Sequence, residues 1–233
     1  MKTAIVTGNF GSGKTTVGKL LEELGCAFLN SDRVVASLYA KKNVQKALVG
    51  AFGKKVIFKK KVNRAFLAGI VFSDKKKRKK LEGIVHPIVF AEIRKFFKRF
   101  RKTKKIAVAE APLFFESPVS SNLRPDFVIV AWCKQKKALA RLKKKGFSEK
   151  ETLARMNAQL PISKKKRLAD FVVDNSKPVE STRKQVKQIF NEIQYKPRLK
   201  RLKARQKLIE QMQAGVDGGK ILVKHRSGLY DRK

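Results

Sequence analysis

Cysteine is scarce in this sequence, and acidic residues are few beside basic ones. The two cysteines, Cys26 and Cys133, lie in apolar segments without metal-ligand spacing, which excludes a disulfide framework. We expect both to be buried and reduced. No apolar run reaches the roughly 18 residues of a membrane-spanning helix. The N-terminal segment has a polar, glycine-rich turn where a signal peptide would be apolar. The chain is therefore expected to be cytoplasmic.

Positive charge dominates the composition. The 233 residues include 57 Lys and Arg but only 18 Asp and Glu, a net charge of +39. The basic runs are spread along the chain, at 75–80, 134–137, 143–145 and 164–167. This excess predicts non-specific binding of nucleic acid at low salt. A solvated, lysine-rich surface without a dedicated partner is the other interpretation, and both remain open. The 42% of hydrophobic residues is enough for a sizeable core.

Short apolar segments without polar alternation predict a parallel sheet covered on both faces. Four of them span 3–7, 26–29, 106–111 and 127–133, and 171–173 is a fifth candidate. Between them, apolar residues recur at helical spacing, as after Lys14 and over 179–194. We therefore expect an α/β fold of three layers, with a parallel sheet of about five strands between helices.

Two helical insertions and a tail define the expected organisation. The first insertion, about 40–104, resembles a helical substrate subdomain, and it includes a helical pattern at 64–72. The second, about 135–166, lies where a mobile lid belongs. Residues 1–196 are expected to form one domain. Pro197 marks a break, and 197–233 form a basic C-terminal extension with a sparse apolar stripe.

The clearest motif is the segment from Gly8 to Thr15, which matches the P-loop pattern G-x-x-x-x-G-K-[ST] between a strand and a helix. Gly8, Gly11 and Gly13 let backbone amides curl around phosphate oxygens at the helix N-terminus. Lys14 can reach the β- and γ-phosphates, and the Thr15 hydroxyl can ligate Mg²⁺. No Asn-Lys-x-Asp motif for guanine is present. These residues predict an ATP and Mg²⁺ site.

Two carboxylates follow predicted strands at the edge where parallel sheets build their sites. Asp32 follows the second strand and is expected to position an acceptor hydroxyl. The alternative is that Asp32 caps a helix beginning at Arg33. Glu110 ends the third strand, where it can hold Mg²⁺ through water.

Beyond these motifs, residues 1 to about 195 resemble the dephospho-coenzyme A kinase family. The similarity runs in order and at matching separations along the chain, which makes it more specific than the P-loop alone. The matching residues outside the P-loop are Leu24-Gly25, Asp32, Phe52-Gly53, Arg64, Val71-Phe72, Leu81-Glu82, His86-Pro87, Pro112-Leu113, Glu116, Arg141-Leu142, Arg155, Gln159, Ala169-Asp170 and Asn175.

The resemblance implies a P-loop NTPase fold and transfer of the ATP γ-phosphoryl group to the ribose 3′-hydroxyl of dephospho-coenzyme A. Lys14, Asp32 and Arg141 would be catalytic. Further ATP contacts would come from Ser12, Thr16 and Arg155, with Arg141 and Arg155 on the lid and adenine side. Asp32, Arg64, the His86-Pro87 corner and Pro112 would bind the acceptor. Arg64 as a plain surface charge and His86 as a structural corner remain open.

The sequence departs from the family pattern at two places. Asn30-Ser31-Asp32 stands where the family has Asp-x-Asp, so one carboxylate is missing. In the expected lid, Ala138 stands in place of the family's Gln and Lys145 in place of its Arg. Lys145 keeps the positive charge but cannot make the two parallel hydrogen bonds of a guanidinium. Two alternatives remain: another P-loop metabolite or nucleotide kinase, and a basic nucleic-acid-binding protein whose nucleotide site is regulatory.

Overall fold

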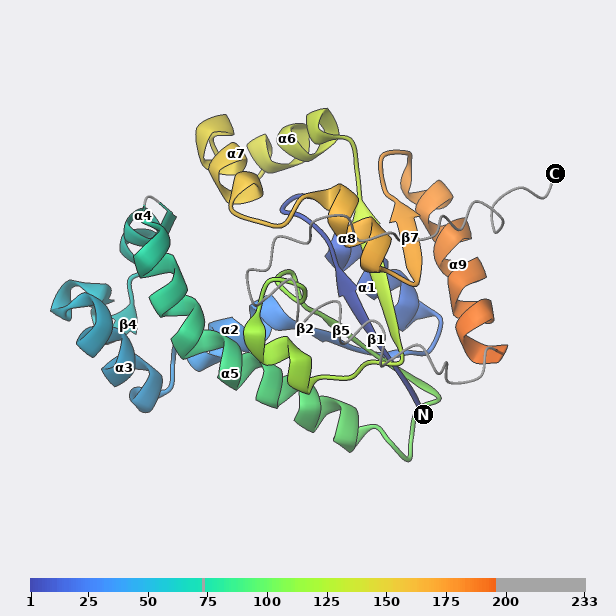
Figure 1. Ribbon diagram of the computed structural model, residues 1–233, viewed down its shortest axis with the longest axis horizontal. Helices are drawn as coiled ribbons and strands as arrows, with labels where there is room; N and C mark the ends of the chain where they lie inside the picture. Colours follow the sequence, from blue (N-terminus) through green and yellow to red (C-terminus); the bar gives the residue numbers. More distant parts are fainter. Residues whose placement is uncertain (73, 196–233) are drawn as a thin grey trace, which may run out of the picture.

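The fold is built on one five-stranded parallel sheet (Figure 1). The structure, a computed structural model, describes residues 1–72 and 74–195. The strand order is β2-β5-β1-β6-β7, and every neighbouring pair is parallel. The strands are β1 (Lys2–Thr7), β2 (Ala27–Asn30), β5 (Ile106–Glu110), β6 (Phe127–Trp132) and β7 (Phe171–Asp174). The prediction of an α/β fold with about five parallel strands is confirmed.

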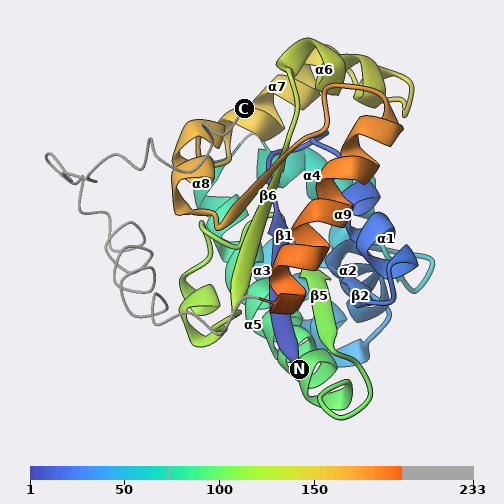
Figure 2. The same cartoon turned by 90° about the vertical axis from the view of Figure 1, so that its right-hand side faces the viewer.

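Helices cover both faces of the sheet because alternate strand residues point to opposite sides. Ala4 and Val6 face a cluster with α1 (Lys14–Glu23) and α9 (Val179–Tyr195), which lie side by side in Figure 2. Ile5 faces the other cluster, which includes Phe90 and Ile93 of α5 (Lys75–Arg99). All three of these strand residues are fully buried. The three-layer prediction is therefore confirmed as well.

The segment between β2 and β5 is mostly helical and extends from one end of the sheet (Figure 1). Its elements are α2 (Ser31–Leu38), α3 (Lys42–Phe52), η1 (Lys54–Val56), β3 (Ile57–Phe58), β4 (Lys61–Val62), α4 (Arg64–Phe72) and α5. The hairpin of β3 and β4 was not expected. Its turn residues Lys59 and Lys60 have positive φ of 47° and 61°, a conformation usually given to Asn or Gly.

Three local expectations need correction. The helix expected to begin at Arg33 begins at Ser31, and Asn30 caps it by accepting from the amides of Asp32 and Arg33. The interpretation of Asp32 as the helix cap is therefore wrong. The His86-Pro87 pair is not a corner, since α5 continues through it. Cys26 is buried as expected, but Cys133 is only half-buried.

The segment after β6 forms three short helices; the first two lie above the sheet in Figure 1, and the third packs on β6. They are α6 (Gln135–Lys143), α7 (Glu149–Asn157) and α8 (Ile162–Leu168). Within the basic run 164–167, Lys165 is 0% exposed, so this run is not uniformly solvated. None of the helices in the two described ranges is long and apolar enough to cross a membrane. The basic extension expected at 197–233 lies outside the described residues.

Candidate active site

The loop between β1 and α1 depends on its glycines. Gly8, Gly11 and Gly13 have φ of 148°, 76° and 83°, in the region that favours glycine. A Cβ on Gly13 would lie 1.8 Å from Asn175 Nδ2, and one on Gly8 would lie 2.1 Å from the Ala131 carbonyl oxygen. The helix α1 begins immediately after, at Lys14. The loop therefore places its amides at a helix N-terminus, as phosphate binding requires.

Lys14 and Glu110 lie close together beneath this loop. Lys14 is 7% exposed, and its Nζ donates to the Asn9 carbonyl at 2.9 Å. Burial lowers the pKa of Lys14 to about 8, although the charge of Glu110 opposes this shift. Burial likewise raises the pKa of Glu110, against the charge of Lys14. An anion bound in the loop would favour the protonated ammonium form of Lys14.

The carboxylate of Glu110 also accepts from two neighbours at the ends of β2 and the loop. The Thr15 hydroxyl donates to Oε2 at 3.0 Å, and Asn30 Nδ2 donates to the same oxygen at 3.0 Å. A hydroxyl and a carboxylate beside a triphosphate suit Mg²⁺, which keeps several waters and takes few protein ligands. Thr15 and Glu110 therefore fit the ion chemically. Asn30 stands where the family pattern has a carboxylate, and it supplies a neutral amide instead.

A cavity of about 540 Å³ opens beside these residues and is the candidate acceptor site. Lys14 and Asp32 lie on one wall, and Pro112, Arg155 and His86 lie on others. Most of the remaining lining is apolar, from α2, α5 and the loop after β5. Its volume falls in the usual range for small-molecule pockets, about 300 to 1,000 Å³. One cavity thus joins the phosphate loop to the segment expected to receive the acceptor.

Two predicted acceptor residues behave differently. His86 Nδ1 lies 2.9 Å from the Ser117 hydroxyl, and burial lowers the His86 pKa to about 4, so its ring is neutral at pH 7. Arg64 is exposed and does not line the cavity; its guanidinium lies 5.6 Å from the centre of the Tyr39 ring, and Tyr39 does line it. The structure therefore places His86 in the lining of the cavity and places Arg64 outside that lining, in contact with Tyr39.

Arg141 of α6 and Arg155 of α7 lie close to the P-loop. Arg141 donates from Nη2 to the Asn175 carbonyl at 2.8 Å, while its Nη1 is buried and has no hydrogen-bond partner among the described residues. The Arg155 guanidinium lies 5.0 Å from the Phe10 ring centre and 4.9 Å from that of Phe147. It also pairs with Glu151 at 2.6 Å. Sequence reasoning missed the two phenylalanines, because apolar residues in loops carry no motif.

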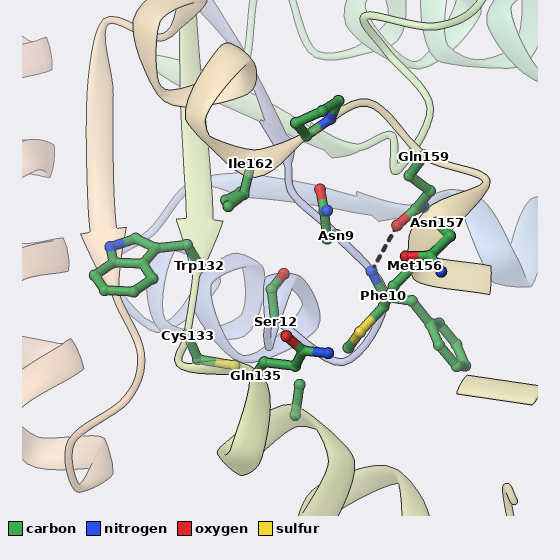
Figure 3. A pocket seen from close by; sticks show the side chains of 12 residues that line it. Asn9, Phe10, Ser12, Trp132, Cys133, Gln135, Met156, Asn157, Gln159 and Ile162 are labelled. Atoms are coloured by element: carbon green, nitrogen blue, oxygen red, sulfur yellow. Dashed lines mark hydrogen bonds between the residues drawn. The ribbon is translucent and has the colours of Figure 1, made fainter. Parts of the chain in front are cut away.

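A second cavity of about 470 Å³, drawn in Figure 3, shares Phe10 and Gln159 with the first. Ser12 lies on its wall and is 3% exposed, with a hydroxyl that has no hydrogen-bond partner among the described residues. Cys133 lines the same cavity, which explains its partial exposure. Thr16 is half-buried in the first turn of α1, next to Thr15.

The site combines a P-loop after β1, a carboxylate at the end of the neighbouring strand β5, and arginines on the helices that follow β6. Together with the strand order, this arrangement defines a small-molecule kinase of the P-loop class. The dephospho-CoA kinase family model matches residues 4–181. The Aquifex aeolicus dephospho-CoA kinase is 36% identical over 199 residues, 84% of this chain and 100% of its own. The chain belongs to the dephospho-CoA kinase family.

Solved structures agree with this assignment. The dephospho-CoA kinase from Campylobacter jejuni is 29% identical, with a TM-score of 0.60 over 83% of this chain and 98% of its own. The Thermus thermophilus protein TT1252 is 30% identical, with a TM-score of 0.67 over 82% of this chain and 97% of its own. The similarity therefore spans the sheet and both helical insertions.

The lowered pKa of Lys14 predicts proton uptake on nucleotide binding. The pKa is about 8 in the free protein, and a bound triphosphate raises it, so binding of Mg-ATP takes up a proton at pH values between the two. The affinity for Mg-ATP should fall about tenfold per pH unit between the pKa of Lys14 in the free protein, near 8, and its higher pKa in the complex. Calorimetry at pH 8.5 in two buffers of different ionisation enthalpy measures the uptake.

The variant Lys14→Arg is the matched control for this experiment, because guanidinium stays charged throughout this pH range. It should show little uptake. Equal proton uptake by the native protein and by Lys14→Arg would contradict a buried Lys14 ammonium as the source.

The contact between Asn30 and Glu110 yields a second prediction. Asn30→Asp keeps the helix cap but places two carboxylates in contact, so stability at pH 7 should fall by about 1 kcal/mol or more. Millimolar Mg²⁺ should raise the melting temperature of this variant more than that of the native protein. Asn30→Ser, which keeps a cap without the charge, is the control. An equal Mg²⁺ effect on all three proteins would argue against a cation at Glu110.

Proposed function

We propose that this chain transfers the γ-phosphoryl group of ATP to the ribose 3′-hydroxyl of dephospho-CoA, giving coenzyme A and ADP in the cytoplasm. The observation that carries the proposal is the 540 Å³ cavity, where Lys14 of the P-loop, Asp32 and Arg155 of the lid face a largely apolar hollow. Membership of the dephospho-CoA kinase family supports the choice of acceptor.

The proposed reaction breaks the bond between the γ-phosphorus and the β–γ bridging oxygen as the 3′-oxygen forms its own bond to phosphorus. Asp32 accepts a hydrogen bond from the 3′-hydroxyl, aims its oxygen in line with the breaking bond, and receives the hydroxyl proton late, as the new bond to phosphorus is completed. The amides of the P-loop and the Lys14 ammonium stabilise the charge on the β- and γ-phosphates. Mg²⁺, held through Thr15 and Glu110, would neutralise further charge on the phosphates.

The lid residues complete the proposed nucleotide site. The unpartnered Nη1 of Arg141 is directed to the start of α1, 3.5 Å from the position of a Gly13 Cβ. A guanidinium here can bind phosphate oxygens, and Arg155 can do so from the cavity side. We assign 135–166 as the lid and 40–104 as the acceptor subdomain, with Tyr39, His86 and Pro112 on the acceptor wall. Arg64 acts on the acceptor only through Tyr39.

The direct test is an acceptor profile. ATP consumption should be measured with dephospho-CoA, adenosine, shikimate and nucleoside monophosphates in turn, and only dephospho-CoA should give rapid turnover. Lys14→Met should lower kcat/KM by about 10²-fold or more and leave the folded state intact, because it removes a charge that the transition state needs. Turnover with another acceptor and none with dephospho-CoA would replace the proposed substrate while keeping the P-loop assignment.

A second property accompanies the enzyme activity. The net charge of +39 should give non-specific nucleic-acid binding at low salt. Fluorescence anisotropy with a labelled single strand should show this binding lost between about 50 and 200 mM salt, by roughly 10³-fold or more. Tight binding that survives physiological salt would instead favour a dedicated nucleic-acid partner.

A further inference from the structure

The lid is tied to the core at two consecutive residues just after α7. The Phe10 amide of the P-loop donates to Gln159 Oε1 at 2.7 Å, the contact drawn as a dashed line in Figure 3. The next residue, Leu160, donates its amide to Glu116 Oε1 at 3.0 Å. Residues Gln159 and Leu160 therefore connect the segment after α7 both to the P-loop and to the loop after β5.

The second tie is anchored by a buried ion pair. Lys165 Nζ lies 2.7 Å from Glu116 Oε1 and donates to the Pro112 carbonyl at 3.2 Å. The Lys165 side chain is fully buried, and that of Glu116 is mostly buried. A lysine enclosed in this way holds its partners in fixed positions, because separating the pair would leave an uncompensated charge inside the protein. Leu160 is consequently held against the β5 end of the sheet.

The first tie reaches the chemistry through Phe10. Its backbone amide is held by Gln159, and its ring lies edge-on to Phe147 with centres 5.2 Å apart. The Arg155 guanidinium lies over both rings. Arg155 lies in the last turn of α7, Gln159 lies two residues beyond the end of that helix, and both side chains line the same cavity. The position of Arg155 over the loop thus depends on where Gln159 holds Phe10.

We propose that Gln159 is a positioning residue for phosphoryl transfer, which sets the register between the P-loop and the lid arginine Arg155 and is itself held in place by the Glu116–Lys165 pair. The proposal rests on the proposed function. Gln159 acts through Phe10, because its acceptor oxygen is already bound to the Phe10 amide and its side chain carries no charge. A register error near 1 Å costs about 10²-fold in rate when the reacting groups are pre-aligned.

The test compares Gln159→Met, which keeps the side-chain length and removes the acceptor, with Thr3→Val. Thr3 makes a similar contact far from the site, accepting from the Asp126 amide at 3.1 Å at the other end of β1. Gln159→Met should lower kcat about ten- to a hundred-fold with KM for dephospho-CoA within about twofold. Thr3→Val should keep kcat. An unchanged kcat in Gln159→Met, or an equal loss in Thr3→Val, would overturn the proposal.

A readout without substrate separates this proposal from the proposed function. Amide hydrogen exchange in the nucleotide-free protein should become faster for peptides covering 8–13 and 149–161 in Gln159→Met, and stay unchanged there in Thr3→Val. Unchanged exchange in Gln159→Met would refute the link. If the native protein is inactive on dephospho-CoA but Gln159→Met still exchanges faster in these peptides, the proposed substrate is wrong and the link between Gln159 and the P-loop stands.

The anchor is tested by Glu116→Leu/Lys165→Met, which removes both charges together and so avoids an unpaired buried charge. Its kcat should fall, and adding Gln159→Met should lower kcat less than about threefold further, because both changes break one chain of contacts. If the losses in kcat from the two sets of changes multiply, they are independent, and the Glu116–Lys165 pair does not hold Gln159 in place. If this protein does not fold, Glu116→Gln/Lys165→Met keeps an amide acceptor for Leu160, and the same comparison is made in that background.

Discussion

The active site depends on how tightly the P-loop is enclosed. Gly8 lies under the Ala131 carbonyl, Gly13 lies against the Asn175 amide, and a Cβ on Gly11 would fall 2.7 Å from a Leu142 methyl group. Strand β6, the residue that follows β7 and helix α6 thus enclose the loop. Because these contacts leave no room for side chains, the loop keeps its amides aimed at one point before any ligand arrives.

Local patterns made much of the fold predictable. The buried strands read as continuous apolar runs, and the helix at 64–72 has the bounds that its periodicity indicated. Predictions failed where a distant contact decided the outcome. Two lysines turn the hairpin at Lys59 and Lys60, although nothing in their chemistry favours positive φ. Lys165 sits in a basic run that looks solvated, yet its partner Glu116 is far away in the sequence.

The residues of the candidate site likewise fall into those that the sequence predicted and those that it did not. The P-loop motif and the strand-end carboxylates could be found from sequence, since both follow from strand, turn and helix order. The grouping of Phe10, Phe147 and Arg155 could not, because it joins the P-loop to residues more than 130 positions later in the sequence. Arg64 fails as a direct cavity contact for a related reason: its guanidinium stacks on the Tyr39 ring, and the cavity is lined by Tyr39 and not by Arg64.

Trp132 is the single tryptophan of the chain and the last residue of β6. The Lys166 ammonium of α8 lies 3.2 Å from the centre of its ring, so the indole links the end of β6 to α8. Any displacement of α8 would move a positive charge away from that ring and change its emission. The protein thereby carries a built-in optical probe of the position of α8, without an added label.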